Sequence, residues 1–167
     1  ATGLQLDLPR AVSGTTASGT HASANFTVSG YDYYGQSMSE VIASSGSAST
    51  TVNGKKAFYQ ITGITVDGGT TGAITIGTTD ILGLPVRVTD AGYIARVGFN
   101  NTLAEDAGTF VAAATATATT TTGDVRGTYV PSGACDGIKR LVVGILLPAI
   151  AVGPNATRQG ALGVTQA

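Results

Sequence analysis

Short segments in which apolar and polar side chains alternate recur along this chain, with glycine, asparagine or aspartate between them. A period of two places successive side chains on opposite faces of a strand, so each segment is expected to form a half-buried β-strand. The clearest examples lie at residues 22–30 and 93–99. About ten such segments, without a longer internal repeat, predict an all-β fold. We expect a β-sandwich of jelly-roll or Greek-key type with little or no helix.

The composition favours the same fold class and suits a protein that works in an assembly. The 167 residues include 24 glycines and no tryptophan, and only 11% of them are charged. Soluble domains average about 25% charged residues, so this surface must consist mainly of Thr, Ser, Ala and Gly. Such a surface is unusual for a free monomer. The length predicts a single β-sandwich domain at residues 22–167, preceded by an N-terminal arm and loop at residues 1–21.

In the N-terminal arm, Leu4, Leu6 and Leu8 alternate with Gln5 and Asp7, and the run S-G-T-T-A-S-G-T follows. This pattern predicts a short strand and then a flexible segment. A terminal strand of this kind either packs on its own domain or adds to the sheet of a neighbouring subunit, and the sequence leaves both open. The three leucines are therefore candidate contacts with other subunits.

The run V-S-G-Y-D-Y-Y-G-Q-S-M-S-E-V-I, at residues 28–42, predicts two strands joined by a turn at residues 31–36. Asp32 and Gly35 suit that turn, because aspartate bonds its own main chain and glycine tolerates left-handed backbone. Glu40 stands at an alternate position from Met38. It either faces inward, where a carboxylate needs a partner such as Lys55 or Lys56, or it lies on the surface, which is the simpler alternative.

Tyr31, Tyr33 and Tyr34 form the sole aromatic cluster of the sequence. Packing within the turn is the favoured interpretation, since a tyrosine ring buries a large apolar area. Contact with a sugar or with another protein is the alternative, because tyrosine also presents a polar hydroxyl. The three tyrosines are therefore candidate contact residues.

Glycine and proline mark where later strands bend or stop. Gly63, within a strand expected at residues 55–66, predicts a bulge or a tight bend. Gly83 and Pro85 predict a turn or an edge position after the next strand. Residues 100–108, N-N-T-L-A-E-D-A-G, are the only plausible helical turn in the chain.

The C-terminal half carries two further strand patterns. Residues 110–122 alternate Ala with Thr, which favours an extended strand over a helix and predicts a hairpin with residues 125–130. Residues 138–147 are apolar on both faces and are expected to form the most buried strand. The apolar run at residues 141–152 is too short to span a membrane, for which about 20 residues are needed, and Pro148 interrupts it.

No group of residues points to an enzyme, a cofactor or a metal site. The only histidine, His21, lies in a Ser/Thr-rich loop without a nucleophile motif, and Cys135 has no second cysteine to pair with. The formal net charge of −1 offers no basic stripe for nucleic acid. The first residues lack the basic and apolar regions of a secretory signal. The loop aspartates lack the spacing of a calcium loop and are expected to serve turns: Asp67, Asp80, Asp90, Asp106 and Asp124.

Four segments resemble a known family. They are G-Y-D-Y-Y-G-Q-S-M-S-E at residues 30–40, G-K-K-A-F at 54–58, I-G-T-T-D-I-L-G-L-P-V-R-V at 76–88 and G-P-N-A-T-R-Q-G-A-L-G-V at 153–164. Together they resemble the capsid decoration, or cement, proteins of tailed bacteriophages, small virion proteins with a jelly-roll fold. The combination D-x-x-G-x-x-M-x-E, G-K-K-A-F and L-G-L-P is fairly specific. The Ala/Thr run at 110–122 has no counterpart in that pattern.

The resemblance implies a virion structural protein, made in the host cytoplasm, that binds the outside of an icosahedral head. It implies homotrimers at or near three-fold positions, with the major capsid protein as partner and with no nucleic acid, membrane or cofactor. It brings no catalytic residues, and the three leucines and three tyrosines above become candidate capsid contacts. Two alternatives stay open: a tail or head–tail junction protein, and a carbohydrate-binding β-sandwich that uses the tyrosines.

Overall fold

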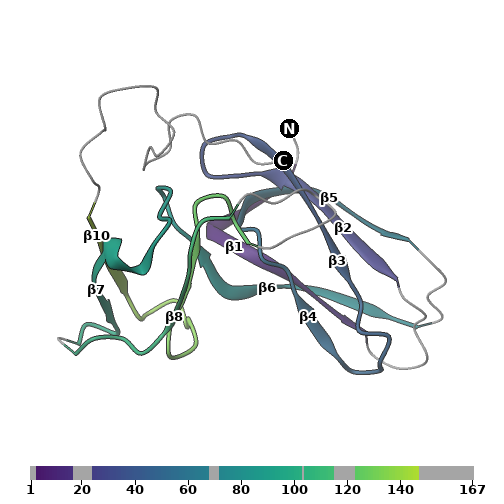
Figure 1. The fold of residues 1–167 in the computed structure, drawn as a ribbon. Coiled ribbons are helices and arrows are strands. Elements are labelled where there is room, and N and C mark those ends of the chain that lie inside the picture. Colours follow the sequence, from purple (N-terminus) through teal and green to yellow (C-terminus); the bar gives the residue numbers. More distant parts are fainter. Residues whose placement is uncertain (1–2, 17–23, 68–71, 103, 115–122, 147–167) are drawn as a thin grey trace.

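The computed structural model describes residues 3–16, 24–67, 72–102, 104–114 and 123–146. Nearly all regular structure in this part of the chain is β, with one short 3-10 helix, η1 (Ala91–Tyr93), so the all-β prediction is confirmed. The ten strands in these residues are β1 (Leu4–Thr16), β2 (Asn25–Tyr31), β3 (Ser37–Ala43), β4 (Thr51–Asn53), β5 (Phe58–Asp67), β6 (Ile74–Gly83), β7 (Ile94–Phe99), β8 (Thr109–Val111), β9 (Thr128–Val130) and β10 (Leu141–Ile145) (Figure 1).

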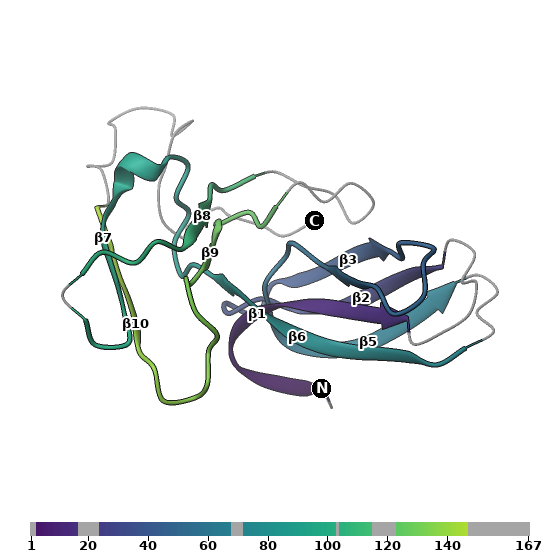
Figure 2. The same cartoon turned by 90° about the horizontal axis from the view of Figure 1, so that it is seen from below.

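The large sheet is built around β1, and its antiparallel order is β3-β2-β5-β1-β6-β9-β8. One edge of β1 pairs first with β5 and then with β4, while the opposite edge pairs with β6. Because β4 and β5 follow one another along the same edge, the sheet folds over into two layers (Figure 2). Gly14 of β1 marks where the layers meet, since a Cβ there would lie 2.8 Å from the Phe26 ring of β2.

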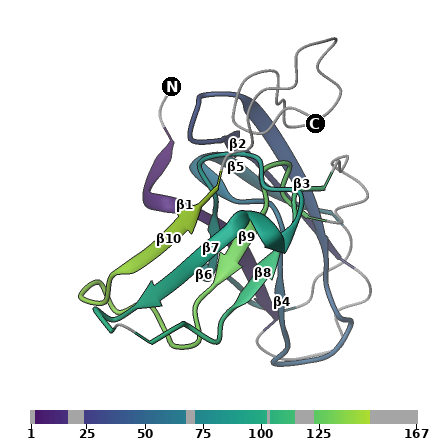
Figure 3. The same cartoon turned by 60° about the vertical axis from the view of Figure 1, so that its left-hand side comes forward.

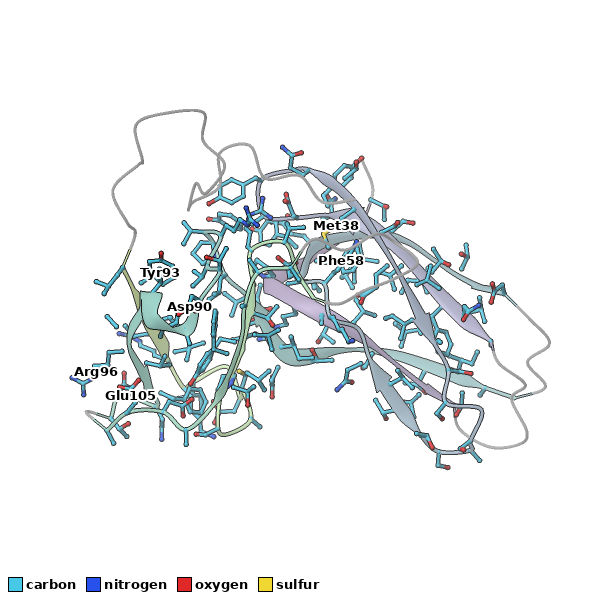
Figure 4. The ribbon with its side chains drawn as sticks, viewed as in Figure 1. Met38, Phe58, Asp90, Tyr93, Arg96 and Glu105 are labelled. Atoms are coloured by element: carbon cyan, nitrogen blue, oxygen red, sulfur yellow. The ribbon has the colours of Figure 1, made fainter. Side chains whose placement is uncertain are left out.

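The main core fills the space between these two layers. Phe58 and Met38 point into it from β5 and β3 and lie close together in Figure 4. β2 and β3 show the alternation of buried and more exposed residues that is expected for half-buried strands. The buried members of this core are Val12, Phe26, Val28, Met38, Ile42, Phe58 and Ile61.

A second, smaller core lies beyond the end of β6, in what we call the small lobe: η1, β7, β8, β9, β10 and the described residues between them. There β7 and β10 form a separate two-stranded antiparallel sheet, seen beside β8 and β9 in Figure 3. The small lobe is joined to the large sheet where Leu82 of β6 pairs with Tyr129 of β9. The buried residues of this second core are Leu84, Val88, Val97 and Tyr129.

Several sequence predictions are confirmed. β2 and β3 form the expected hairpin, paired in register from Asn25 with Ala43 to Tyr31 with Ser37. A register shift in the β2–β5 pairing occurs beside Gly63, as a bulge at that glycine requires. β6 ends at Gly83, where a turn was expected, and β8 and β9 pair as an antiparallel hairpin.

Other predictions are wrong. Among the described residues the single helical turn is η1, at residues 91–93, and Asp90 caps it by accepting a hydrogen bond from Gly92 N–H. No helix lies within residues 100–102 or 104–108. The strand expected over residues 110–122 is short: β8 ends at Val111, residues 112–114 are not in a strand, and residues 115–122 lie outside the described part.

The prediction for residues 138–147 also fails. β10 covers only residues 141–145, and Ile138, Val142 and Leu146 are 84%, 65% and 57% exposed. The reason is the size of its sheet, because β10 has β7 as its only strand partner among the described residues. A two-stranded sheet packs one face on a core and leaves the other uncovered.

The proposed arm contains β1, whose residues from Arg10 to Thr16 lie between strands on both edges. Of the two placements left open for it, the structure shows packing on its own domain. In the described residues, no helix has the length and hydrophobicity needed to cross a membrane.

Candidate interaction surfaces

The turn between β2 and β3 is held by Asp32. Its Oδ1 accepts hydrogen bonds from the Tyr34 and Gln36 N–H groups, both at 2.8 Å, and Gly35 adopts φ +76°. The other oxygen, Oδ2, lies 2.7 Å from Nη1 of Arg126, and both side chains are buried. Asp32 therefore fixes the turn and also ties it to a distant part of the chain.

Glu40 faces inward and is fully buried, so its surface placement is ruled out. Its two oxygens accept hydrogen bonds from the main-chain N–H groups of Lys55, at 2.7 Å, and Lys56, at 3.2 Å. The partners named from the sequence are thus correct, although main-chain groups make these contacts. A side chain at Gly54 has no room, since its Cβ would lie 2.5 Å from Glu40 Oε2.

Lys56 is buried beside this carboxylate, and its Nζ donates a hydrogen bond to Ser39 O at 3.0 Å. Burial lowers the pKa of the Lys56 ammonium, and the negative charges of Glu40 and Asp124 oppose that effect. The ammonium therefore sits between two acidic groups that offset part of its desolvation cost.

Asp124 and Arg126 complete the set from the segment before β9. Asp124 accepts hydrogen bonds from Ala57 N–H at 3.0 Å and from Arg126 N–H at 2.8 Å. The guanidinium of Arg126, already paired with Asp32, also lies over the Tyr34 ring, 4.8 Å from its centroid. We call Asp32, Glu40, Lys56, Asp124 and Arg126 the buried charge network.

The buried charge network is structural in its geometry. Its carboxylates accept main-chain hydrogen bonds, and all five side chains are buried. The network joins the β2–β3 turn, the G-K-K-A segment and the segment before β9. In the resembling segments at residues 30–40 and 54–58, Asp32, Glu40 and Lys56 therefore serve to hold the fold together, while the resembling segment at residues 153–164 lies outside the described residues.

The three candidate tyrosines have different environments. The Tyr34 hydroxyl donates to Pro85 O at 2.6 Å, and its ring packs on Arg126, so Tyr34 is engaged in the fold. Tyr33 is 54% exposed and makes edge-to-face contacts with Tyr34, at a centroid distance of 5.4 Å, and with Tyr59, at 5.2 Å. Tyr31 is half-buried.

The structure adds Tyr59 and two glutamines to this cluster. They surround a shallow hollow of about 390 Å³, which is also bordered by Asp32 and Gly35. The Gln5 Nε2 donates a hydrogen bond to the Tyr59 hydroxyl at 2.9 Å. We call this surface the tyrosine hollow, defined by Gln5, Tyr31, Tyr33, Tyr59 and Gln60.

The three candidate leucines also differ in their environments. Leu6 packs against the main core, whereas Leu4 and Leu8 are exposed. Leu8 borders a groove of about 560 Å³ that runs between β1 and the two-stranded sheet of the small lobe. We call it the apolar groove; most of its side chains are hydrophobic, and they include Leu8, Pro9, Leu82, Leu84, Phe99, Leu141, Val142 and Val143.

The turn position expected for Asp80 is wrong, because Asp80 lies within β6 and forms an ion pair with Arg10 at 3.2 Å. Asp106 accepts hydrogen bonds from the Tyr129 hydroxyl at 2.8 Å and from Ser132, and Glu105 accepts one from Val97 N–H while lying 4.0 Å from Arg96. Figure 4 shows Glu105 and Arg96 together at the rim of the small lobe, away from Met38 and Phe58. No group of three or more potential metal ligands occurs among the residues that the structure describes.

Cys135 forms no reactive site with the described residues around it. Burial raises the pKa of the Cys135 thiol, and its main-chain N–H donates to Asp80 at 3.1 Å. A raised pKa keeps the thiol protonated and weakly nucleophilic. His21 lies outside the described residues.

Comparisons of the chain with protein-family models, with curated proteins and with solved structures found no significant match. The functional proposal therefore rests on the geometry of the molecule and on the motif resemblance.

Proposed function

We propose that this chain is a bacteriophage virion structural protein, a capsid decoration or cement protein that binds the outside of the head and stabilises the shell. The capsid assignment rests on the motif resemblance. The observation that most supports a role in assembly is the apolar groove, together with the exposed side chains around it. Large exposed apolar patches on soluble proteins mark interaction sites. Only 11% of the residues are charged, so little electrostatic repulsion opposes contact with other proteins.

The framework role of the motif residues agrees with this proposal. Asp32, Glu40, Gly54 and Lys56 are needed for the fold and are hidden from partners. A protein whose task is to be a rigid surface needs such a framework and no catalytic group. The contacts with the major capsid protein then fall to exposed residues, of which Leu8 and Val142 border the apolar groove.

Stabilisation follows from mass action. A subunit that binds the assembled shell and not the dissociated coat protein shifts the equilibrium towards the shell by its binding free energy. In this proposal the chain acts as a homotrimer near the three-fold positions, and it needs no cofactor, nucleic acid or membrane.

The test compares heads stripped of this protein with heads to which purified protein has been added back. Added protein should cosediment with the heads and raise the temperature at which they release DNA. Leu8→Asp and Val142→Asp should weaken cosedimentation by about tenfold or more, because a charge placed in an apolar contact is desolvated without a partner. Val66→Asp changes a valine away from the groove that is 42% exposed, close to the 45% of Leu8, and should leave binding intact.

Three results would contradict the proposal: equal heat resistance of stripped and decorated heads, no cosedimentation, or equal effects of the groove and control variants. Circular dichroism of each variant separates loss of binding from loss of folding. Antibody labelling in electron micrographs distinguishes the head from the tail or the head–tail junction, the second candidate location. Sedimentation of the purified chain tests the trimer.

A further inference from the structure

We propose that the tyrosine hollow binds a neutral saccharide. The site is distinct from the apolar groove, and this proposal does not depend on attachment to a capsid. Three features support it: the way the sheet assembles the residues, the chemistry of the lining and the size of the hollow.

The sheet places the polar residues of the hollow side by side. Gln5 of β1 lies opposite Gln60 of β5, and Gln60 lies opposite Tyr31 of β2. Directly opposed residues of neighbouring antiparallel strands project from the same face of a sheet. Three adjacent strands therefore form a row of Gln5, Gln60 and Tyr31, and the row is fixed by main-chain pairing.

Two more rings stand beside this row. Tyr33, in the turn that Asp32 holds, meets the Tyr59 ring at an interplanar angle of 69°. An edge-to-face pair leaves part of a ring face open, and Tyr33 is more than half exposed. The hydrogen bond from Gln5 to the Tyr59 hydroxyl fixes the second ring. The hollow is thus preformed, which reduces the entropy lost when a ligand binds.

The lining matches the two surfaces of a sugar ring. Tyrosine faces accept the C–H side of a pyranose, while glutamine amides and tyrosine hydroxyls can donate to and accept from its hydroxyl groups. The one charged group at the rim is Asp32, whose buried carboxylate is already bonded to main-chain N–H groups and to Arg126. A ligand without charge is therefore favoured.

A protein partner fits this surface less well. Tyrosine is common in protein interfaces, but the buried cores of such interfaces are more apolar than the rest of the surface, and none of the described residues that line the hollow is aliphatic. The apolar groove, in contrast, has that character. The volume of about 390 Å³ lies at the lower end of the range of small-molecule sites and suits one or two sugar rings.

The test uses the full chain and neutral di- and trisaccharides of glucose, galactose and N-acetylglucosamine, with binding measured by saturation-transfer NMR and by titration calorimetry. At least one should bind with a dissociation constant below about 10 mM, as expected for an open site with few contacts. Tyr33→Ala should weaken binding about tenfold or more, because stacking on that ring is lost. Gln60→Ala should weaken binding less.

Gln36→Ala is the matched control, since it removes an exposed glutamine side chain of the same turn that does not line the hollow. It should leave the affinity unchanged. Failure of every neutral saccharide to bind up to about 10 mM would overturn the proposal. Unchanged affinity in Tyr33→Ala, or NMR shifts at the hollow caused by the capsid protein instead of a sugar, would do so as well. Loss of sugar binding with intact head binding would separate this site from the proposed capsid contact.

Discussion

Replacing Glu40 by glutamine tests whether the buried charge network stabilises the fold through charge. The substitution keeps the size of the side chain and removes its negative charge. In the native protein both oxygens accept main-chain hydrogen bonds, from Lys55 and Lys56. Glutamine offers one oxygen, so its amide NH₂ must face one of the two N–H groups. The buried Lys56 ammonium loses the negative charge of Glu40 and keeps that of Asp124.

Both effects lower the free energy of unfolding. A buried donor left without an acceptor costs about 1–3 kcal/mol, and breaking a buried charge pair costs about 3–5 kcal/mol. Because Asp124 still faces Lys56, we expect a combined loss near 4 kcal/mol in the free energy of unfolding. For a chain of this size that loss lowers the melting temperature by about 8–16 °C. It is a large part of the about 5–15 kcal/mol that stabilises a typical domain.

The assay is urea unfolding followed by circular dichroism, together with calorimetry. Glu105→Gln is the control, because Glu105 also accepts a main-chain hydrogen bond but its side chain is 61% exposed, and water can replace the lost acceptor. It should cost less than about 1 kcal/mol. Adding Lys56→Met to Glu40→Gln should cost less than the two single changes summed, by about 1 kcal/mol or more. Equal losses for Glu40→Gln and Glu105→Gln, or simple additivity in the double variant, would refute the reasoning.

Two further predictions concern packing and pH. Gly54→Ala should lower the free energy of unfolding, measured with urea, by about 1–3 kcal/mol because the added Cβ meets the Glu40 carboxylate. Gly63→Ala has open space around the new Cβ and should lower it far less. Similar losses in the two variants would show that the contact at Gly54 is unimportant. Burial and the Asp106 hydrogen bond raise the pKa of Tyr129 to about 12. The contribution of the protonated Tyr129 hydroxyl to the free energy of unfolding is therefore complete below pH 10 and is lost as the pH rises through about 12. Absorbance at 295 nm should show a late phenolate step that Tyr129→Phe removes; a titration curve unchanged by that substitution would contradict the assignment.

Much of the large sheet could be predicted because its signals are local. The alternation around Phe26 and Met38 marks half-buried strands, and the turn chemistry of Asp32 and Gly35 fixes how they connect. Gly63 within a strand pattern correctly predicts the bulge beside it. The inward position of Glu40 follows from its spacing to Met38, although only the structure decides between that position and the surface.

The features that escaped prediction depend on distant parts of the chain. Asp124 resembles an ordinary turn residue until the fold brings it to Ala57, and Tyr59 joins Tyr33 only through the pairing of β2 with β5. The apolar run of β10 looks like a central strand, yet its exposure is set by how few strands surround it. Local patterns carry no information about the number of neighbours that a strand will have.

The buried charge network also dictates an order of events in folding. The bond between Ala57 and Asp124 joins residues 67 apart in the sequence, and the ion pair of Asp32 with Arg126 closes a still longer loop. During synthesis, the first strands emerge while Asp32 and Lys56 still lack these partners, so burying them early is unfavourable. Such distant contacts slow folding, because the chain loses the entropy of closing a long loop before the contact can stabilise it. The protein is therefore expected to reach its native state only after the segment before β9 has left the ribosome, and a fragment that ends ahead of Asp124 should remain unfolded.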